Sequence, residues 1–279
     1  MNGARPSVKI GVFDSGVGGL TVLRALLARI PSAEYLYLGD TARLPYGSKS
    51  QQTIARYAVS SARFLVEQGA EFLVIACNTA SALAIDEIRA ACPVPVLGVI
   101  ETGANGAKAS SRSGDVLVMA TAATVESHAY ASACRARALR AFEKACPLLV
   151  PLVEEGWIDH AVTHDVVGIY VRDLLQEAEA ALPGMHADTL VLGCTHYPLL
   201  RTVIERALPP GIRVIDSAEV TAEEVAQRLG GNHTGKQTGE SLSPRCHYFA
   251  TDSVVKFRAL GGRFLGHRIE DVVHVDLGG

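Results

Sequence analysis

The sequence lacks any long apolar run, and this absence excludes a membrane-spanning helix. No apolar stretch approaches the roughly 20 residues that cross a bilayer, and the N-terminal residues MNGARPSVKIGVF lack the basic and then apolar pattern of a signal peptide. The six cysteines show neither the CxxC spacing of a zinc site nor the density of a disulfide-stapled secreted domain. We therefore expect a cytoplasmic protein with free thiols and no membrane partner.

Neither sign of charge dominates the chain, which excludes two further classes of protein. The formal net charge is −3 at pH 7 and charged residues make up 20% of the sequence, so neither a disordered tail nor a polyphosphate-binding surface is predicted. We accordingly expect no nucleic-acid partner. Hydrophobic residues make up 48% of the 279 residues, which is enough for two domains, because single cores stop growing near ~250–300 residues.

Apolar runs and helical patterns alternate along the chain. After a strand-like run at residues 8–13, apolar residues recur at helical spacing up to Ile30, and Pro31 ends the pattern. The same rhythm predicts strands at residues 34–40, 73–76, 92–101, 114–127, 147–157, 190–193 and 212–219, and helices at 50–68, 126–146 and 163–181. Alternation of this kind is typical of the α/β class, in which mainly parallel sheets are flanked by helices.

Polar or reactive side chains directly follow several of the predicted strands. These residues are Asp14, Tyr46, Cys77, Thr121 and Cys194. Ligands of parallel α/β sheets bind outside the carboxyl ends of the strands. We therefore expect these side chains to line a single crevice.

Two of these positions belong to a weak internal repeat. LVIACNTASA at 73–82 and LVLGCTHYPLL at 190–200 share an apolar strand, then a cysteine with short polar neighbours, then a helical continuation. The repeat predicts two similar domains with the active site in the cleft between them. We expect residues 1–100 plus 211–279 to form the first domain and 101–210 the second, with a polar surface loop at 231–245.

A thiol at the start of a helix lies where the helix dipole lowers its pKa. A Cys–His dyad would explain only one of the two thiols, whereas two thiols on opposite sides of a small ligand fit acid–base chemistry at a stereocentre. No PLP lysine motif, dinucleotide fingerprint or metal cluster accompanies them, so we expect neither a cofactor nor a metal. The other four cysteines receive no role, because free cysteine usually behaves as a small buried hydrophobe.

Neighbouring groups would tune these thiols or hold the ligand. A charge on Asp14 or His196 would shift the pKa of a nearby thiol, although either side chain could instead cap a helix. The glycine run at 16–19 could cradle a carboxylate or an amine, or simply permit a tight turn. Tyr46, in a Pro-containing turn, could equally be a packing residue.

Four separated motifs together resemble one family. GVFDSGVGGLTVL, YLGDTARLPYGSKS, ACNTASA and LGCTHYPLL are similar to motifs of the glutamate racemases, within the cofactor-independent aspartate/glutamate racemase family, which supply D-glutamate for bacterial peptidoglycan. The resemblance runs from about Lys9 to Leu265. It implies two α/β domains with glutamate between them, and commonly a homodimer.

The resemblance also implies roles for individual residues. Cys77 and Cys194 would be the catalytic acid–base pair, with Cys77 serving D-glutamate and Cys194 serving L-glutamate, assisted by Asp14, His196 and Glu154. The residues implied to contact the substrate are Asp14, Ser15, Pro45, Tyr46, Gly47, Asn78, Thr79, Thr121, Thr195 and His196. For the threonine-rich segment, the register of Thr121 against Thr124 stays open.

Two other functions remain possible from the sequence. One is a racemase of aspartate or another acidic amino acid, since the two-thiol arrangement is shared across that wider group. The other is a non-catalytic protein that binds an amino acid, against which the intact pair of thiols speaks.

Overall fold

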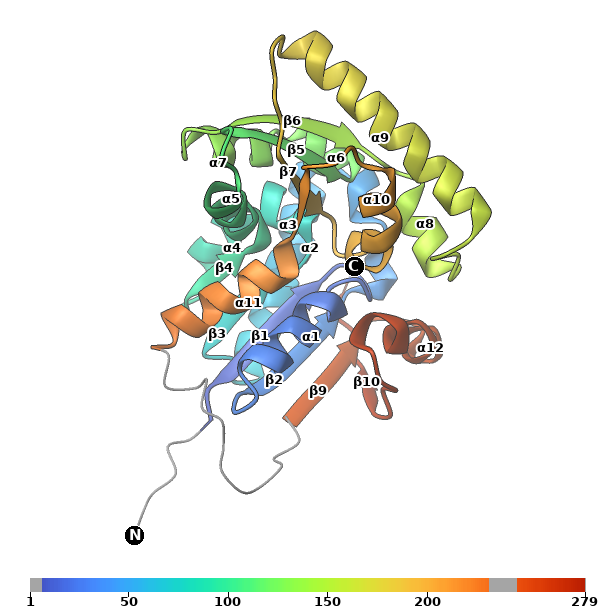
Figure 1. Ribbon diagram of the computed structural model, residues 1–279. Helices are drawn as coiled ribbons and strands as arrows, with labels where there is room; N and C mark the ends of the chain where they lie inside the picture. Colours follow the sequence, from blue (N-terminus) through green and yellow to red (C-terminus); the bar gives the residue numbers. More distant parts are fainter. Residues whose placement is uncertain (1–6, 231–244, 279) are drawn as a thin grey trace, which may run out of the picture.

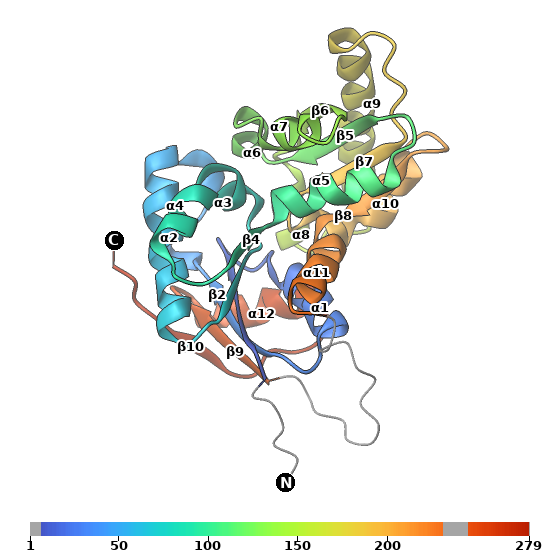
Figure 2. The ribbon, with the colours of Figure 1, turned by 90° about the vertical axis from the view of Figure 1, so that its left-hand side faces the viewer.

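The computed structural model describes residues 7–230 and 245–278, and its strands form two parallel sheets (Figures 1 and 2). The first sheet has the order β10-β9-β2-β1-β3-β4. Its strands are β1 (Lys9–Asp14), β2 (Glu34–Gly39), β3 (Phe72–Ile75), β4 (Val96–Gly98), β9 (Arg245–Ala250) and β10 (Val272–His274). The sheet therefore combines strands from both ends of the chain.

The second sheet is built from the middle of the chain and has the order β6-β5-β7-β8. Its strands are β5 (Asp115–Ala120), β6 (Arg140–Ala145), β7 (Thr189–Gly193) and β8 (Arg213–Asp216). All strand pairs in both sheets are parallel. The predicted α/β class with parallel sheets is thus confirmed.

Helices cover both faces of each sheet because the central strands are apolar on both sides. Around the first sheet, α2 and α4 lie on one side and α1, α11 and α12 on the other (Figure 2). The α-helices are α1 (Leu20–Arg29), α2 (Gln51–Glu67), α3 (Asn78–Leu83), α4 (Ile85–Ala91), α5 (Val99–Ser110), α6 (Ala122–Glu126), α7 (Ala129–Arg135), α8 (Leu149–Glu154), α9 (Ala161–Ala181), α10 (Arg201–Ala207), α11 (Ser217–Arg228) and α12 (Val254–Leu265). Within the described residues, none of them is long and apolar enough to cross a membrane.

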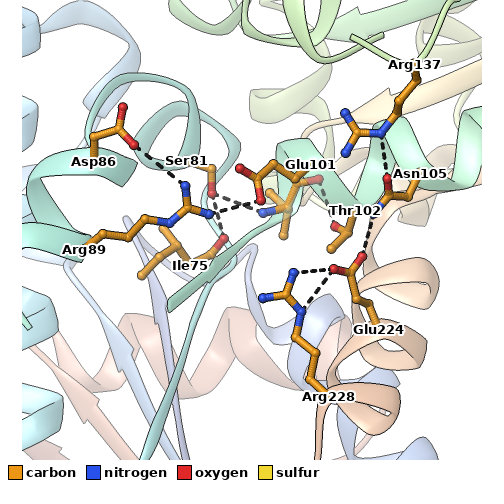
Figure 3. Close-up of polar contacts among 11 residues, drawn as sticks. Ile75, Ser81, Asp86, Arg89, Glu101, Thr102, Asn105, Arg137, Glu224 and Arg228 are labelled. Atoms are coloured by element: carbon orange, nitrogen blue, oxygen red, sulfur yellow. Dashed lines mark hydrogen bonds and ion pairs between the residues drawn. The ribbon is translucent and has the colours of Figure 1, made fainter. Parts of the chain in front are cut away.

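Two helices carry the chain between the sheets. The chain leaves the first sheet after β4 through α5 and returns after β8 through α11, and these two helices pack against each other. The hydroxyls of Thr102 and Thr221 lie 2.6 Å apart in this contact. Asn105 donates to Glu224 across 2.8 Å, as Figure 3 shows. The two crossings are therefore joined to each other by buried and half-buried polar contacts.

Two predicted elements around residue 146 are wrong. The sequence predicts one helix over 126–146, but α7 ends at Arg135 and β6 follows as the edge strand beside β5. The composition of β6, RAFEKA, favours a helix, and pairing with β5 overrides that propensity. The apolar run at 147–157 contains the helix α8, because Leu149 and Val153 bury one helical face and a short apolar run does not separate the two structures by itself.

Other predicted boundaries also moved. The expected strands at 92–101 and 114–127 end at Gly98 and Ala120, and a helix begins within two residues of each. The chain does not return to the first sheet after Gly211, because β8 pairs with β7 in the second sheet and the return comes with β9. The loop predicted at 231–245 lies outside the described residues except for Arg245, which begins β9.

Candidate active site

The carboxyl ends of the central strands of both sheets carry the residues that the sequence singled out. β1 ends at Asp14 and β3 leads into Cys77, while β5 leads into Thr121 and β7 into Cys194. The charge on Asp14 acts on both Cys77 and His196, so the ends of the two sheets come together.

Cys77 is the N-cap residue of α3 and is almost fully buried. Its sulfur accepts the N–H of Ala80 at 3.4 Å and donates to the Ser15 hydroxyl at 3.4 Å. Burial, followed by the negative charge of Asp14, raises the pKa of the Cys77 thiol to about 12. The expectation that the helix dipole lowers this pKa is wrong, because loss of solvation outweighs the dipole of a helix of only six residues. Cys77 is therefore a protonated thiol at neutral pH.

Asp14 lies next to this thiol and is 1% exposed. Its Oδ2 accepts the Gly16 N–H at 2.8 Å, whereas Oδ1 has no hydrogen-bond partner among the described residues. Burial raises the pKa of the Asp14 carboxyl, and the positive charge of His196 partly offsets this effect. Asp14 thus presents one free carboxyl oxygen in a buried place.

On the other side, His196 joins Cys194 to a carboxylate. Its Nδ1 lies 3.9 Å from the Cys194 sulfur, and its Nε2 lies 3.2 Å from Oε1 of Glu154. Burial alone acts to lower the pKa of His196, but hydrogen bonds to Cys194 and Glu154 outweigh it and raise the pKa to about 10. The same contact lowers the pKa of Glu154. The Cys194 sulfur thus lies beside an imidazole that is cationic at neutral pH.

The alternative that the His196 side chain caps a helix is wrong. His196 precedes the 3₁₀ helix Tyr197–Leu200, but its side chain makes no capping hydrogen bond. The ring instead packs edge-to-face on Phe264 of α12, with 5.0 Å between the ring centroids. Glu154 is held nearby because its carbonyl accepts a hydrogen bond from Arg263 at 2.9 Å.

Three threonines meet where the two sheets face each other. Thr79 Oγ1 lies 3.1 Å from Thr121 Oγ1 and 3.4 Å from Thr124 Oγ1, and the last two hydroxyls are 2.9 Å apart. Both candidates of the threonine-rich segment thus reach the same cluster. Thr124 is the more deeply buried of the two.

The backbone of the glycine run permits a close approach between the halves. A Cβ atom built at Gly18 would lie 2.2 Å from Thr195 Oγ1 and 2.6 Å from two His196 ring atoms. Nearby, the Thr21 hydroxyl donates to the carbonyl of Thr195 at 3.0 Å. The structure gives Gly18 a role other than the two predicted for the glycine run. Its lack of a side chain lets the Cys194–Thr195–His196 segment pack against the start of α1.

The turn that contains Pro45, Tyr46 and Gly47 is anchored by a carboxylate that sequence reasoning missed. Tyr46 donates its hydroxyl to Oδ2 of the fully buried Asp40 at 2.5 Å. Asp40 Oδ1 also accepts hydrogen bonds from Arg43 and Thr251, each at 2.9 Å. The Tyr46 hydroxyl is therefore used in holding the turn. The only available signal was the position of Asp40 at the end of the strand predicted over 34–40.

A second residue that the sequence did not reveal is Tyr130 of α7. Its hydroxyl donates to Oδ1 of Asn78 at 2.8 Å, and Nδ2 of Asn78 is buried with no partner among the described residues. Leaving a buried donor without a hydrogen-bond partner costs about 1–3 kcal/mol. The free amide N–H is therefore suited to a ligand acceptor beside Cys77.

Comparison with known proteins gives a consistent picture. Residues 19–225 match the family model described as Asp/Glu/Hydantoin racemase. The chain is 50% identical to the glutamate racemase of Koribacter versatilis, over 97% of this chain and 98% of that protein. It is 47% identical to the glutamate racemase of Syntrophus aciditrophicus, over 96% of each.

Solved structures agree in fold. The glutamate racemase of Thermus thermophilus, in complex with β-chloro-D-alanine, is similar with a TM-score of 0.83 and 43% identity over 98% of this chain and 99% of that chain. The enzyme of Francisella tularensis, in complex with D-glutamate, gives a TM-score of 0.83 and 32% identity over 97% and 98%. Picrophilus torridus aspartate racemase, at 18% identity over 80% and 95% and a TM-score of 0.56, shares the fold alone.

Proposed function

Because the chain belongs to the Asp/Glu/hydantoin racemase family, we propose that it interconverts L-glutamate and D-glutamate through two cysteines that act on opposite faces of Cα. The substrate is glutamate, since relatives with 43–50% identity over nearly the whole chain are glutamate racemases. The product, D-glutamate, supplies peptidoglycan synthesis. A non-catalytic binding protein would not need two opposed thiols.

The proposed mechanism rests on one observation. The two sulfurs have different surroundings. Cys194 lies beside a cationic imidazole held by Glu154, whereas Cys77 is a buried thiol whose pKa is raised to about 12. We propose that Cys194 accordingly accepts the proton in one direction and Cys77 donates one. General acid–base catalysis at a stereocentre needs this division.

In the direction from L to D, the Cys194 thiolate takes the Cα proton of L-glutamate. The carbanion then receives the Cys77 proton from the opposite face, so that the products are D-glutamate, a Cys194 thiol and a Cys77 thiolate. In the reverse direction the roles are exchanged. The negative charge of Asp14 disfavours the Cys77 thiolate and so promotes its reprotonation. No cofactor or metal takes part in these steps.

We place the substrate among the polar groups around the two sulfurs. The residues on the Cys77 side are Asn78 and Thr79, and Thr121 faces them from the second sheet. Cys194 is followed by Thr195 and His196. Nδ2 of Asn78, which has no partner among the described residues, and the threonine hydroxyls are donors that suit the two carboxylates of glutamate. The free Oδ1 of Asp14 and the Ser15 hydroxyl suit its ammonium group.

The experiment is solvent exchange in D2O without added cofactor and with a chelator present, on L-glutamate and L-aspartate side by side. The proposal predicts loss of optical rotation together with deuterium at Cα of glutamate, and at most slow exchange with aspartate. A folded sample that leaves the Cα proton of glutamate in place would contradict it.

We also infer a homodimer in the cytoplasm. The family membership supports the dimer, and sedimentation equilibrium of the whole chain tests it, with a monomer at micromolar concentration as the contrary result. All six cysteines are free, which fits a reducing compartment.

A further inference from the structure

Tyr130 reaches from one half of the structure to the other. It lies in α7, beside the second sheet, and is fully buried, yet its hydroxyl donates to the Asn78 side chain at the start of α3, which follows a strand of the first sheet. The two residues are 52 positions apart in the chain. The contact is thus a tertiary hydrogen bond between the two halves, next to Cys77.

This bond determines where the rest of the Asn78 side chain points. A carboxamide is planar, so fixing its oxygen also fixes the direction of its two N–H donors. Asn78 is 3% exposed, and its Nδ2 has no partner among the described residues. Without Tyr130 the amide could rotate or flip, and the N–H groups would no longer have one orientation.

The structure holds Tyr130 firmly enough for this role. A Cβ atom at Gly193 would lie 2.8 Å from the ring, and one at Gly103 would lie 3.0 Å from the hydroxyl, so both backbones pack closely on the side chain. Just beyond α7, Arg137 donates to Asn105 of α5 at 2.6 Å, and Asn105 donates in turn to α11 (Figure 3). The helix that carries Tyr130 is therefore tied to both crossings between the sheets.

We propose that Tyr130 is a positioning residue for racemisation, whose hydroxyl orients the Asn78 carboxamide so that Nδ2 donates to a carboxylate of glutamate. The inference rests on the proposed function, since it takes Asn78 to bind the substrate. Because Tyr130 belongs to the opposite half, the donor is set only when both halves are in place.

The first test is Tyr130→Phe, which keeps the ring and removes only the hydroxyl. We expect KM for both enantiomers to rise about five- to tenfold, the range of one lost hydrogen bond. We expect kcat to change less than about twofold, because the donor binds substrate and transition state alike. A purely structural role would lower the melting temperature without this split between KM and kcat.

A double-mutant cycle tests whether Tyr130 acts through Asn78. We expect Asn78→Ala to raise KM at least as much as Tyr130→Phe, and the double variant to match Asn78→Ala. Tyr35→Phe is the matched control, since Tyr35 is also fully buried and donates to two backbone carbonyls, of Leu26 and Ile30. Its KM should stay at the parent value even if its melting temperature falls.

The outcomes distinguish a failure of the proposed function from a failure of the positioning role of Tyr130. A parent protein that does not exchange the Cα proton of glutamate would overturn the proposed function. An active parent with an unchanged KM in Tyr130→Phe, or with additive effects in the cycle, would overturn the positioning role alone. An active Asn78→Ala variant with the parent KM would also overturn it.

Discussion

At the scale of single residues, burial and one neighbour decide what each thiol can do. Cys77 and Cys194 are each 5% exposed, and both follow a strand. Cys77 has the carboxyl of Asp14 nearby, which disfavours a second negative charge, whereas Cys194 has the imidazole of His196. Equal burial therefore accompanies opposite electrostatic surroundings, and this asymmetry underlies the proposed division of roles.

The pairing of Glu154 with His196 can be tested by pH titration. The contact raises the pKa of His196, so replacing the carboxylate in Glu154→Gln should lower that pKa from about 10 toward the ordinary range of a histidine. The imidazole would then lose its proton at lower pH. NMR of isotope-labelled histidine, compared between the parent and the variant, measures the shift. An unchanged titration would contradict the assigned partner.

Most residues of the candidate site were identified from the sequence because they occur in short motifs. Asp14 ends a strand, and Cys77, Cys194 and His196 come soon after one. Glu154 was supplied by the resemblance. Other residues could not be predicted because their partners are remote in sequence. Thr251, for example, bonds to Asp40 from 211 positions away, and no local pattern announces such a contact.

At the scale of elements, strands β1 to β4 of the first sheet were predictable, whereas β9, β10 and the middle of the chain were less so. Buried central strands such as β3 are apolar throughout, and their pattern is distinctive. The edge strand β6 is half-exposed and charged, and α8 is a short apolar helix. In both elements, tertiary pairing or packing decides the structure, and the sequence pattern carries little of that information.

The turn at Pro45–Gly47 gives a prediction at this scale. Asp40→Asn removes the charge that holds Tyr46, Arg43 and Thr251. We expect the free energy of unfolding in urea to fall by roughly 1–3 kcal/mol, and KM for glutamate to rise because the turn loosens.

The matched control for this change is Asp86→Asn. Asp86 pairs with Arg89 at 3.7 Å (Figure 3). The Asp86 side chain is nevertheless 88% exposed. Exposed pairs of this kind contribute little, so neither stability nor KM should change appreciably. Equal effects of the two substitutions would contradict the anchoring role of Asp40.

At the scale of the whole molecule, the residues of the candidate site come from both sheets. Hydrogen bonds join Thr79 to Thr121, Asn78 to Tyr130 and Thr21 to Thr195. We propose that each sheet with its helices forms one domain, with the crossings at α5 and α11. The internal repeat in the sequence predicted two similar domains with a cleft between them. The sheet to which β8 belongs depends on its pairing with β7, which the turn at Gly211 does not reveal.

The close approach between the halves predicts the effect of one added methyl group. In Gly18→Ala, the new Cβ would meet Thr195 and His196 and push the Cys194 segment away. We expect kcat/KM to fall roughly 10- to 100-fold, as for an ångström-scale misplacement, with circular dichroism unchanged. Gly168→Ala in α9 is the control, because no atom lies within 4 Å of its added Cβ, and it should keep full activity.

The central claim is that Cys77 and Cys194 act on opposite faces of one carbon. The most direct measurement is Cα deuterium exchange of L- and D-glutamate, each offered separately to Cys77→Ser and Cys194→Ser in D2O. We predict that both variants lose racemisation by ~10²- to 10⁴-fold. We also predict that Cys77→Ser exchanges only L-glutamate and Cys194→Ser only D-glutamate. Racemisation at the parent rate by either variant would contradict the two-thiol account.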